Sequence, residues 1–278
     1  MLPMNICKLF SFVNNIFNLL KHNQFLLKQL VVRNIATRYR GSLLGFFWTL
    51  VQPLLMLIVY TFVFTYVFQA RWGTVLGNNK GAFAMIMFAG IACFNIFSEA
   101  LTCCSVVIIN YPNFVKKVLF PLELIPLATV ISSFIIGIPW FIMLLIGSLI
   151  LLKVFSWTML LIGFVLFPLF MITLGLGLFI AALGVYLRDL PQLLAILLQV
   201  MFFLTPIFYP IESVPAVMRT VLSWNPMFYI VEGVRKVLLY GEVPSIAQWL
   251  IPWGVGFLFL GLGYVWFMKT KKGFADVL

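Results

Sequence analysis

Two arginines flank a tyrosine at Arg38, Tyr39 and Arg40, at the edge of an apolar run that continues to Phe68. A guanidinium group is a planar cation that can hold an oxyanion through two parallel hydrogen bonds. The run that follows is uncharged, long enough to cross a bilayer, and interrupted by Gln52-Pro53. A cationic edge, a spanning run and a helix break together predict a protein that works on or through a membrane.

One carboxylate, Glu99, falls inside a second long apolar run. An isolated negative charge at that depth is costly, so the group must be protonated, paired or in contact with water. Two interpretations stay open. Glu99 lines a cavity near the cytoplasmic side, or it is the structural partner of a cation such as Arg38 or Arg40.

Residues suited to catalysis are few. The sequence has one histidine, His22, and its seven acidic residues are scattered, with no pair at a spacing typical of a carboxylate site. It lacks the GxxxxGK[ST] loop that binds nucleotide phosphates. The four cysteines show neither CxxC nor histidine spacing. The sequence therefore predicts no catalytic residue, no metal site and no cofactor on this chain.

The composition excludes an ordinary soluble domain. Of the 278 residues, 64% are hydrophobic and only 9% are charged, whereas a soluble domain has about 25% charged residues. Lipid must therefore be the solvent of this chain. The net charge of +11 comes from cations that flank apolar runs, which is typical of membrane topology and not of nucleic-acid binding.

The predicted fold class is an all-α integral membrane protein with six transmembrane helices. Residues 1–42 form an N-terminal amphipathic segment that lies at the interface, because neither 4–21 nor 24–40 has an unbroken apolar run of spanning length. Residues 43–278 form the transmembrane domain. A spanning helix needs about 20 apolar residues. The predicted spans are 43–69, 82–109, 124–151, 155–187, 190–210 and 248–268.

Six spans place both ends of the chain on one side, and the distribution of cations predicts which side. With the amino end inside, the cytoplasmic side holds Lys8, Lys21, Lys28, Arg33, Arg38, Arg40, Lys116, Lys117, Arg188, Lys269, Lys271 and Lys272. The outer side then holds Arg71, Lys80, Lys153, Arg219, Arg235 and Lys236. Since cytoplasmic loops carry the excess of Lys and Arg, both termini are predicted to be cytoplasmic.

The loop between the second and third spans carries Lys116 and Lys117, and the prolines at 112 and 121 leave room for a helix of two turns. A short helix that projects into the cytoplasm suits docking to a partner protein. An ordinary positively charged turn is the alternative interpretation.

The connection between spans five and six, residues 211–247, is apolar but rich in proline and glycine. Val217–Leu222 and Met227–Leu239 are predicted to be short helices that cannot cross the bilayer. Irregular backbone at membrane depth survives only against protein or beside water, so these pieces predict re-entrant or interfacial helices at the outer mouth of a pathway. A seventh span within 214–240 is the alternative.

Aromatic side chains gather near this outer connection. Each ring combines apolar area with, in Tyr and Trp, a polar group, and such rings would offer sugars a weak surface. An interfacial aromatic belt is the alternative interpretation. The candidates for an aromatic path are Phe208, Tyr209, Trp224, Phe228 and Tyr229.

Several motifs occur in the order found in a known family. They are RYRGSLLGFFWTLVQPLL, NFVKKVLFPLELIPL, LRDLPQLL, TPIFYP and a later NP…EGVR…G…P run. Over essentially its whole length the chain resembles the transmembrane subunit of type-2 ABC exporters, in the branch that moves O-antigen, capsule or teichoic-acid polymers.

The resemblance implies a homodimer in the bacterial cytoplasmic (inner) membrane, in contact with membrane lipids and two copies of an ABC ATP-binding subunit. ATP and Mg would be bound by that partner and not by this chain. The cargo would be a polysaccharide linked to undecaprenyl diphosphate. Residues 112–120 match the coupling helix, and 211–240 match the outer gate helices. From their charge and depth, and not from the resemblance, we expect Arg38, Tyr39 and Arg40 to meet this diphosphate.

The residues matched to the coupling helix, and so to the contact with the ATPase, are Asn113, Phe114, Val115, Lys116 and Lys117.

Three other functions remain as alternatives. A permease of the same family for a drug or a simple lipid often carries a large extracytoplasmic domain or lacks the lysine-rich loop. An integral-membrane enzyme acting on a lipid-linked sugar would gather acids or histidines at one membrane face. A simple channel would need rings of charge or a carbonyl filter.

Overall fold

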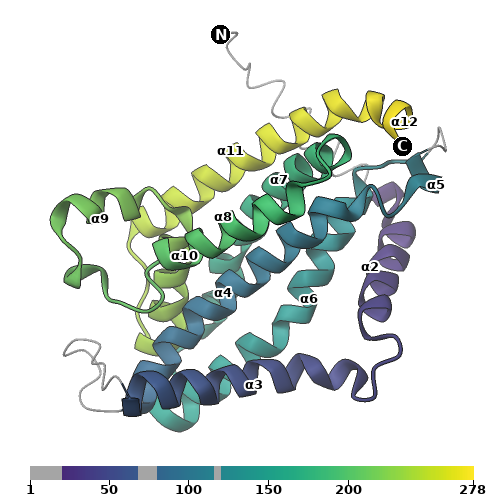
Figure 1. The fold of residues 1–278 in the computed structure, drawn as a ribbon. Helices are drawn as coiled ribbons and strands as arrows, with labels where there is room; N and C mark the ends of the chain where they lie inside the picture. Colours follow the sequence, from purple (N-terminus) through teal and green to yellow (C-terminus); the bar gives the residue numbers. More distant parts are fainter. Residues whose placement is uncertain (1–20, 68–79, 116–119) are drawn as a thin grey trace.

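The computed structural model describes residues 21–67, 80–115 and 120–278, and all regular secondary structure within these ranges is helical (Figure 1). The α-helices are α2 (Gln24–Tyr39), α3 (Trp48–Tyr60), α4 (Lys80–Val107), α5 (Pro112–Val115), α6 (Leu124–Gly147), α7 (Ile162–Tyr186), α8 (Leu190–Leu204), α9 (Ala216–Ser223), α10 (Pro226–Arg235), α11 (Ile246–Thr270) and α12 (Phe274–Val277). The 3-10 and π segments are η1 (Gly45–Phe47), η2 (Thr61–Val67), η3 (Ser148–Leu152), η4 (Trp157–Leu161), η5 (Ile211–Ser213), η6 (Lys236–Tyr240) and η7 (Lys271–Gly273).

Among the described residues, four helical segments have the length and apolar composition needed to cross a bilayer. They are Gly81–Val107, Leu124–Leu152, Trp157–Tyr186 and Ile246–Val277. Two shorter apolar helices, Trp48–Val63 and Leu190–Leu204, fall within the predicted spans 43–69 and 190–210. These segments confirm the all-helical membrane class.

The fifth predicted span extends too far. It was expected to reach residue 210, but α8 ends at Leu204. Thr205 has extended backbone angles (φ −88°, ψ 130°) because the ring of Pro206 excludes the helical region for the residue before it. The chain then continues to Pro210 without a helix.

The predicted helix break at Gln52-Pro53 is wrong, since α3 continues through Pro53. Pro53 stands in the second turn of α3 with its ring buried, where neighbouring groups can take up the unbonded carbonyl. The chain changes direction earlier, between α2 and α3. Gly41 and Gly45 have φ of 81° and 49° there, a conformation that glycine adopts without steric cost.

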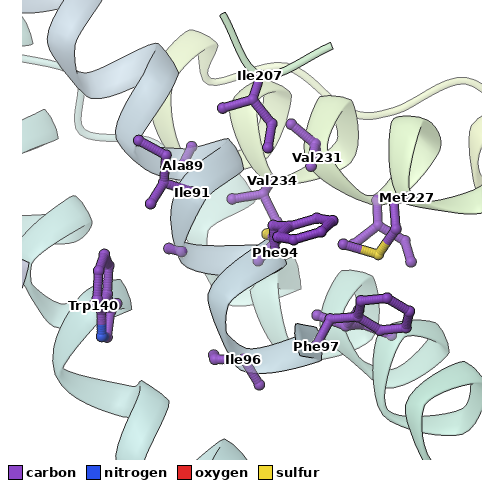
Figure 2. Close-up of a cluster of buried hydrophobic side chains, with 14 of the residues drawn as sticks. Ala89, Ile91, Phe94, Ile96, Phe97, Trp140, Ile207, Met227, Val231 and Val234 are labelled. Carbon is purple, nitrogen blue, oxygen red and sulfur yellow. The ribbon is translucent and has the colours of Figure 1, made fainter. Parts of the chain in front are cut away.

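α4 lies at the centre of the packing and contacts α6, α7, α8 and α10. Figure 2 shows the side chains around it: Trp140 from α6, Ile207 from the segment after α8, and Val231 from α10. Trp140 also stacks on Phe88 of α4, with ring centroids 5.3 Å apart. A helix that is apolar on nearly all sides is expected in such a buried position.

The contact between α7 and α11 depends on two glycines. A Cβ atom on Gly175 would meet the backbone of Phe259, and one on Gly263 would meet the Gly175 carbonyl. Small residues let helix backbones approach each other in this way in membrane proteins. Gly254 and Gly261, on the same helix α11, face open space instead.

The molecule has two distinct ends. α2, α5 and α12 lie at one end, and α9 and α10 lie at the other, with the long helices running between them (Figure 1). α2 packs on α6 through Leu30 and Val31, which are buried against Leu124 and Ala128. The first part of the predicted amphipathic segment, residues 1–20, lies outside the described residues.

Candidate functional site

Arg38 and Glu99 form an ion pair between the last turn of α2 and the second half of α4. The Arg38 Nη1 donates a hydrogen bond to Glu99 Oε1. The pair is only partly shielded from solvent, since the side chains are 37% and 20% exposed. The Glu99 charge is therefore compensated by Arg38, and both side chains remain accessible enough for another charged group to replace one of them.

The same two residues line an open cavity of about 600 Å³ between four helices. Asn34 and Arg38 reach it from α2, and Gln52 reaches it from α3. Glu99 stands on the α4 wall, and Ser132 stands on the α6 wall. Ligand cavities in proteins are typically about 300–1,000 Å³, so the space suffices for a small ligand or for the end of a larger one.

The structure brings Arg38 into the cavity wall but not Arg40, which is exposed at the end of α2. The Arg38 guanidinium lies 5.9 Å from the centre of the Tyr39 ring. Partial burial raises the pKa of the Tyr39 hydroxyl, and the positive charge of Arg38 opposes this shift. Tyr39 therefore stays neutral at physiological pH and keeps a proton to donate.

Part of the segment matched to a coupling helix forms α5. Asn113 is exposed, Phe114 is half-buried and Val115 is buried. The Phe114 ring packs on Phe120, with centroids 4.5 Å apart. Lys116 and Lys117 lie outside the described residues.

α5 is tied to α2 by a stack of aromatic and cationic groups. The Arg33 guanidinium carbon lies 4.4 Å from the centre of the Tyr111 ring and 5.6 Å from that of Phe114. The Tyr111 hydroxyl also donates a hydrogen bond to Asn34 Oδ1 at 3.3 Å. The Nε and Nη2 atoms of Arg33 are buried without a hydrogen-bond partner, so the rings provide the compensation for this cation.

The aromatic residues of the predicted outer path fall into separate groups. Phe208 packs against Phe202 at 5.1 Å and Tyr60 at 6.1 Å, and the Tyr209 hydroxyl donates to the Phe203 carbonyl at 3.0 Å. These contacts join the end of α8 to the end of α3.

Phe228 and Tyr229 lie on α10, with ring centroids 5.0 Å apart. Trp224, at the end of α9, is 85% exposed. Within one protomer, these three rings therefore lie on α10 or at the end of α9. Phe208 and Tyr209 lie on the segment that follows α8.

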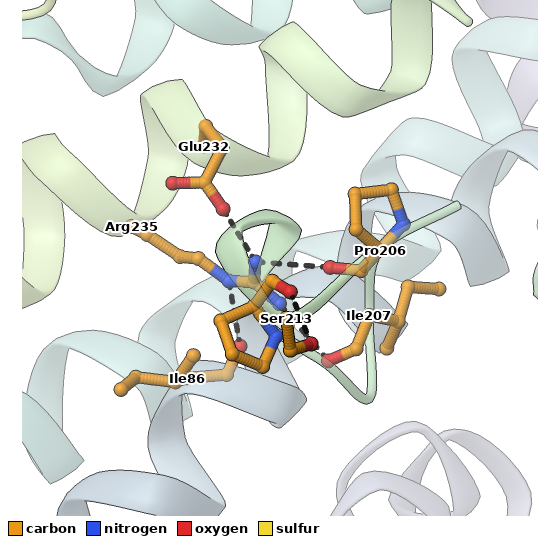
Figure 3. A network of polar contacts seen from close by, with 7 residues as sticks. Ile86, Pro206, Ile207, Ser213, Glu232 and Arg235 are labelled. Carbon is orange, nitrogen blue, oxygen red and sulfur yellow. Dashed lines mark hydrogen bonds and ion pairs between the residues drawn. The ribbon is translucent and has the colours of Figure 1, made fainter. Parts of the chain in front are cut away.

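Sequence reasoning missed the most buried charge in the described residues. Arg235 was predicted to lie on the outer side, within the short helix Met227–Leu239, and its complete burial was not foreseen. Its Nη1 donates to Glu232 Oε1 at 2.6 Å and to the Pro206 carbonyl at 3.0 Å (Figure 3). Its Nε and Nη2 donate to the carbonyls of Ile86 and Ile207.

The burial of Arg235 follows from these bonds, because a buried cation is tolerated only when it is paired and hydrogen-bonded. One signal for it was present in the sequence. Glu232 and Arg235 stand three residues apart in an apolar stretch, which is the spacing that lets two helical side chains meet.

Comparison with known proteins places these features in a family. The family model described as ABC-2 type transporter matches residues 25–239. An O-antigen export system permease protein, RfbA, from Myxococcus xanthus is 28% identical over 256 residues, which cover 90% of this chain and 94% of the relative. An RfbA protein from Klebsiella pneumoniae is 27% identical, covering 88% and 92%.

A polysialic acid transport protein, KpsM, from Escherichia coli is 23% identical over 245 residues, which cover 84% of this chain and 89% of the relative. The family match includes α2, the cavity, α5 and the Arg235 network, and leaves out α11 and α12. The chain belongs to the ABC-2 type transporter family of membrane permeases.

Proposed function

We propose that this chain is the permease subunit of an ATP-driven exporter that moves a lipid-linked polysaccharide across the cytoplasmic membrane. The observation that carries the proposal is the similarity, along 84–90% of this chain, to permeases named for O-antigen export and polysialic acid transport. The partly exposed Arg38 beside a polar cavity supports it, because a carrier diphosphate needs such a cation.

The proposed topology has six spans, α3, α4, α6, α7, α8 and α11, with both termini in the cytoplasm. The placement of α5 and α12 at one end of the molecule, opposite α9 and α10, supports it (Figure 1). The excess of Lys and Arg on the predicted inner segments supports it as well.

α8 has 15 residues, and at about 1.5 Å per residue such a helix falls short of the roughly 30 Å of a hydrocarbon core. The non-helical segment after α8 completes this crossing in the proposal. α9 and α10 are then short outer helices that close the exit.

The working unit in this proposal is a homodimer of the chain with two copies of an ABC ATP-binding subunit. α5 and the residues that follow it dock on that subunit, which binds ATP and Mg. The exposed Asn113 on α5 supports this role. Closure of the ATP-binding subunits would move α5, and the movement would open a path between the two protomers.

Arg38, Tyr39 and Arg40 receive the undecaprenyl diphosphate of the cargo in this proposal. Arg38 is held by Glu99 before cargo arrives, so the diphosphate takes the place of the carboxylate. Tyr39 adds a neutral hydroxyl donor, and the exposed Arg40 adds a second cation at the interface.

The test reverses both charges with Arg38→Glu and Arg40→Glu. We expect polymer at the cell surface to be lost while membrane insertion and dimerisation persist, because the cationic edge is gone and the spans are unchanged. Arg188→Glu, an exposed cation between α7 and α8, serves as the matched control. Unchanged surface polymer in the double variant would refute the headgroup role.

The cargo is tested independently. The permease is purified with its ATPase partner, and the bound lipid is identified by mass spectrometry. A polyprenyl diphosphate glycan is the expected ligand. A drug-like molecule or a simple phospholipid in its place would contradict the polysaccharide assignment and leave the transporter family standing.

A further inference from the structure

One face of α4 is polar although the helix is otherwise buried and apolar. Asn95, Ser98 and Thr102 of α4 recur at intervals of three and four residues. All three line the cavity beside Glu99, as does Asn110 in the turn that follows the helix. Residues at this spacing share one side of a helix. Polar groups in a membrane span are costly and usually face an internal cavity or a pathway, so this face requires a polar partner.

The opposite walls of the cavity are polar as well. α2 contributes Asn34 and Thr37, and α6 contributes Thr129, Ser132 and Ser133. The Arg38–Glu99 ion pair adds one charge of each sign, so the described lining carries no net charge. The cavity is thus polar and neutral, with its cation at the end of α2.

The hydroxyl groups of this lining have spare acceptor capacity. Thr37, Thr102 and Ser132 each donate their proton to a carbonyl one turn earlier in their own helix, at 2.8, 2.8 and 2.6 Å. A hydroxyl oxygen has two lone pairs that stay available after it donates. Each of these side chains can therefore accept a hydrogen bond from a ligand hydroxyl.

Unbonded amides complement these acceptors. The side-chain amides of Gln52 and Asn95 make no hydrogen bond to any other part of the chain that the structure describes. Each amide offers two donors and one acceptor oxygen. Amides and hydroxyls that line one space match a ligand whose own groups both donate and accept.

We infer that this cavity binds the sugar residue attached directly to the diphosphate of the lipid carrier. The inference rests on the proposed function, since it places the diphosphate at Arg38 and the adjoining sugar against α4. A neutral, hydroxyl-rich ring satisfies the amides and hydroxyls without requiring a further charge. An apolar ligand would leave these groups unpaired, which is unfavourable.

The test compares sugar-free and glycosylated probes on the permease complex in lipid nanodiscs. One probe is a prenyl diphosphate without sugar, and the others each carry a single N-acetylglucosamine or galactose. We expect the wild type to bind at least one glycosylated probe about tenfold more tightly, because two or more ligand hydrogen bonds are added at about 0.5–1.5 kcal/mol each.

Two near-isosteric variants, Asn95→Leu and Thr102→Val, remove polar groups from the α4 wall. We expect each to lower the preference for the glycosylated probe by about threefold to tenfold, with binding of the sugar-free probe unchanged. Gln199→Leu removes an exposed amide on α8, away from the cavity. It should leave the preference intact.

A second readout uses the wild-type chain and needs no substitution. Cys103 is exposed and lines the cavity, whereas Cys93 and Cys104 are buried. Alkylation by N-ethylmaleimide, followed by peptide mass spectrometry for each cysteine, should slow severalfold at Cys103 with the glycosylated probe. The sugar-free probe should protect it less.

The outcomes separate the two proposals. Equal binding of all probes, or a preference that survives both variants, would overturn the sugar site and leave the diphosphate site at Arg38 standing. If neither the glycosylated nor the sugar-free probe binds, the headgroup role itself fails, and the sugar site fails with it.

Discussion

At the scale of single residues, Glu99 competes with any external anion for the Arg38 guanidinium. The carboxylate keeps Arg38 oriented and compensated while the cavity holds no ligand. It also lowers the net attraction that a diphosphate experiences at this point. If Arg38 receives a headgroup, as proposed, a strongly charged headgroup would displace Glu99 more readily than a weakly charged one.

Glu99→Gln should raise the affinity for a sugar-free prenyl diphosphate by up to about fivefold, since a partly exposed ion pair is worth about 0.2–1 kcal/mol. Binding titration in nanodiscs measures the effect. Glu123→Gln breaks a different pair, with Lys271 at 3.4 Å, and is expected to leave the affinity unchanged. Weaker binding in Glu99→Gln would show that Glu99 supports the headgroup site.

Single residues also show where sequence reasoning reaches its limit. The Arg38 and Glu99 side chains were linked as one of two possibilities because their charges are opposite and both adjoin apolar runs. The burial of Arg235 was missed because its charge is compensated by the carbonyls of Ile86, Pro206 and Ile207, which are distant in sequence. No local pattern predicts such backbone partners.

At the scale of elements, α2 and α5 are joined side chain to side chain. Arg33 lies against Tyr111 and Phe114, and Asn34 accepts a hydrogen bond from Tyr111. Since α2 also carries Arg38, a displacement of α5 reaches the cavity wall through one short helix. In the proposed exporter, this connection would carry a movement of α5 directly to the headgroup site at Arg38.

Arg33→Leu removes a cation–π contact worth about 0.5–2 kcal/mol. We expect the ATP-binding partner still to bind and hydrolyse ATP, while polymer exported per ATP falls about twofold to tenfold. Export and ATP hydrolysis are measured on the same reconstituted complex. Lys28→Leu removes an exposed cation from the same helix and should have no such effect. Equal coupling in the two variants would disprove the role of Arg33.

The α7–α11 contact makes a second prediction at this scale. Gly263→Ala places a methyl group against the Gly175 carbonyl, and overpacking of this kind costs about 1–3 kcal/mol. Thermal unfolding in detergent should show the loss. Gly261→Ala, on the open side of the same helix, is the control and should be neutral or slightly stabilising. Similar unfolding temperatures for the two variants would contradict the close approach.

Long elements were easier to predict than short ones. α4, α6, α7 and α11 follow long, predominantly apolar runs, which predict spans by their length. The end of α8 was harder to predict, because it is set only by Pro206, which prevents Thr205 from continuing the helix within an apolar stretch. The polar face of α4 was missed because its residues are dispersed by helical spacing, and only the packing of α2 and α6 around it makes a cavity.

At the scale of the whole molecule, the two ends carry different chemistry. At one end (Figure 1), α2 carries Lys28, Arg33 and Arg38, the last of which forms the partly exposed ion pair, and η7 before α12 carries Lys271 and Lys272. At the other end, α9 exposes apolar side chains such as Val217 and Val221. Exposed apolar side chains on α8, such as Ile196 and Phe203, are left to contact lipid or a second copy of the chain. The sequence alone does not predict which of these two contacts covers each side chain.

The orientation is tested with single-cysteine variants in a cysteine-free background. Asn113→Cys on α5 and Thr220→Cys on α9 both replace exposed residues. An impermeant maleimide should label position 220 in intact spheroplasts and position 113 only in inverted vesicles, because the charge bias places α5 inside. Labelling of both positions from the same side would refute the proposed topology.

The bonding of Arg235 has a mechanical consequence for the exit. One guanidinium connects the first half of α4, the turn after α8 and the last turn of α10 (Figure 3). These three segments cannot separate without leaving a buried charge unpaired, so in the proposed exporter we expect them to move together. Most residues of α9 are exposed, and α9 is not among the three segments that these bonds connect. If α9 covers the exit, as proposed, it can move aside without breaking them.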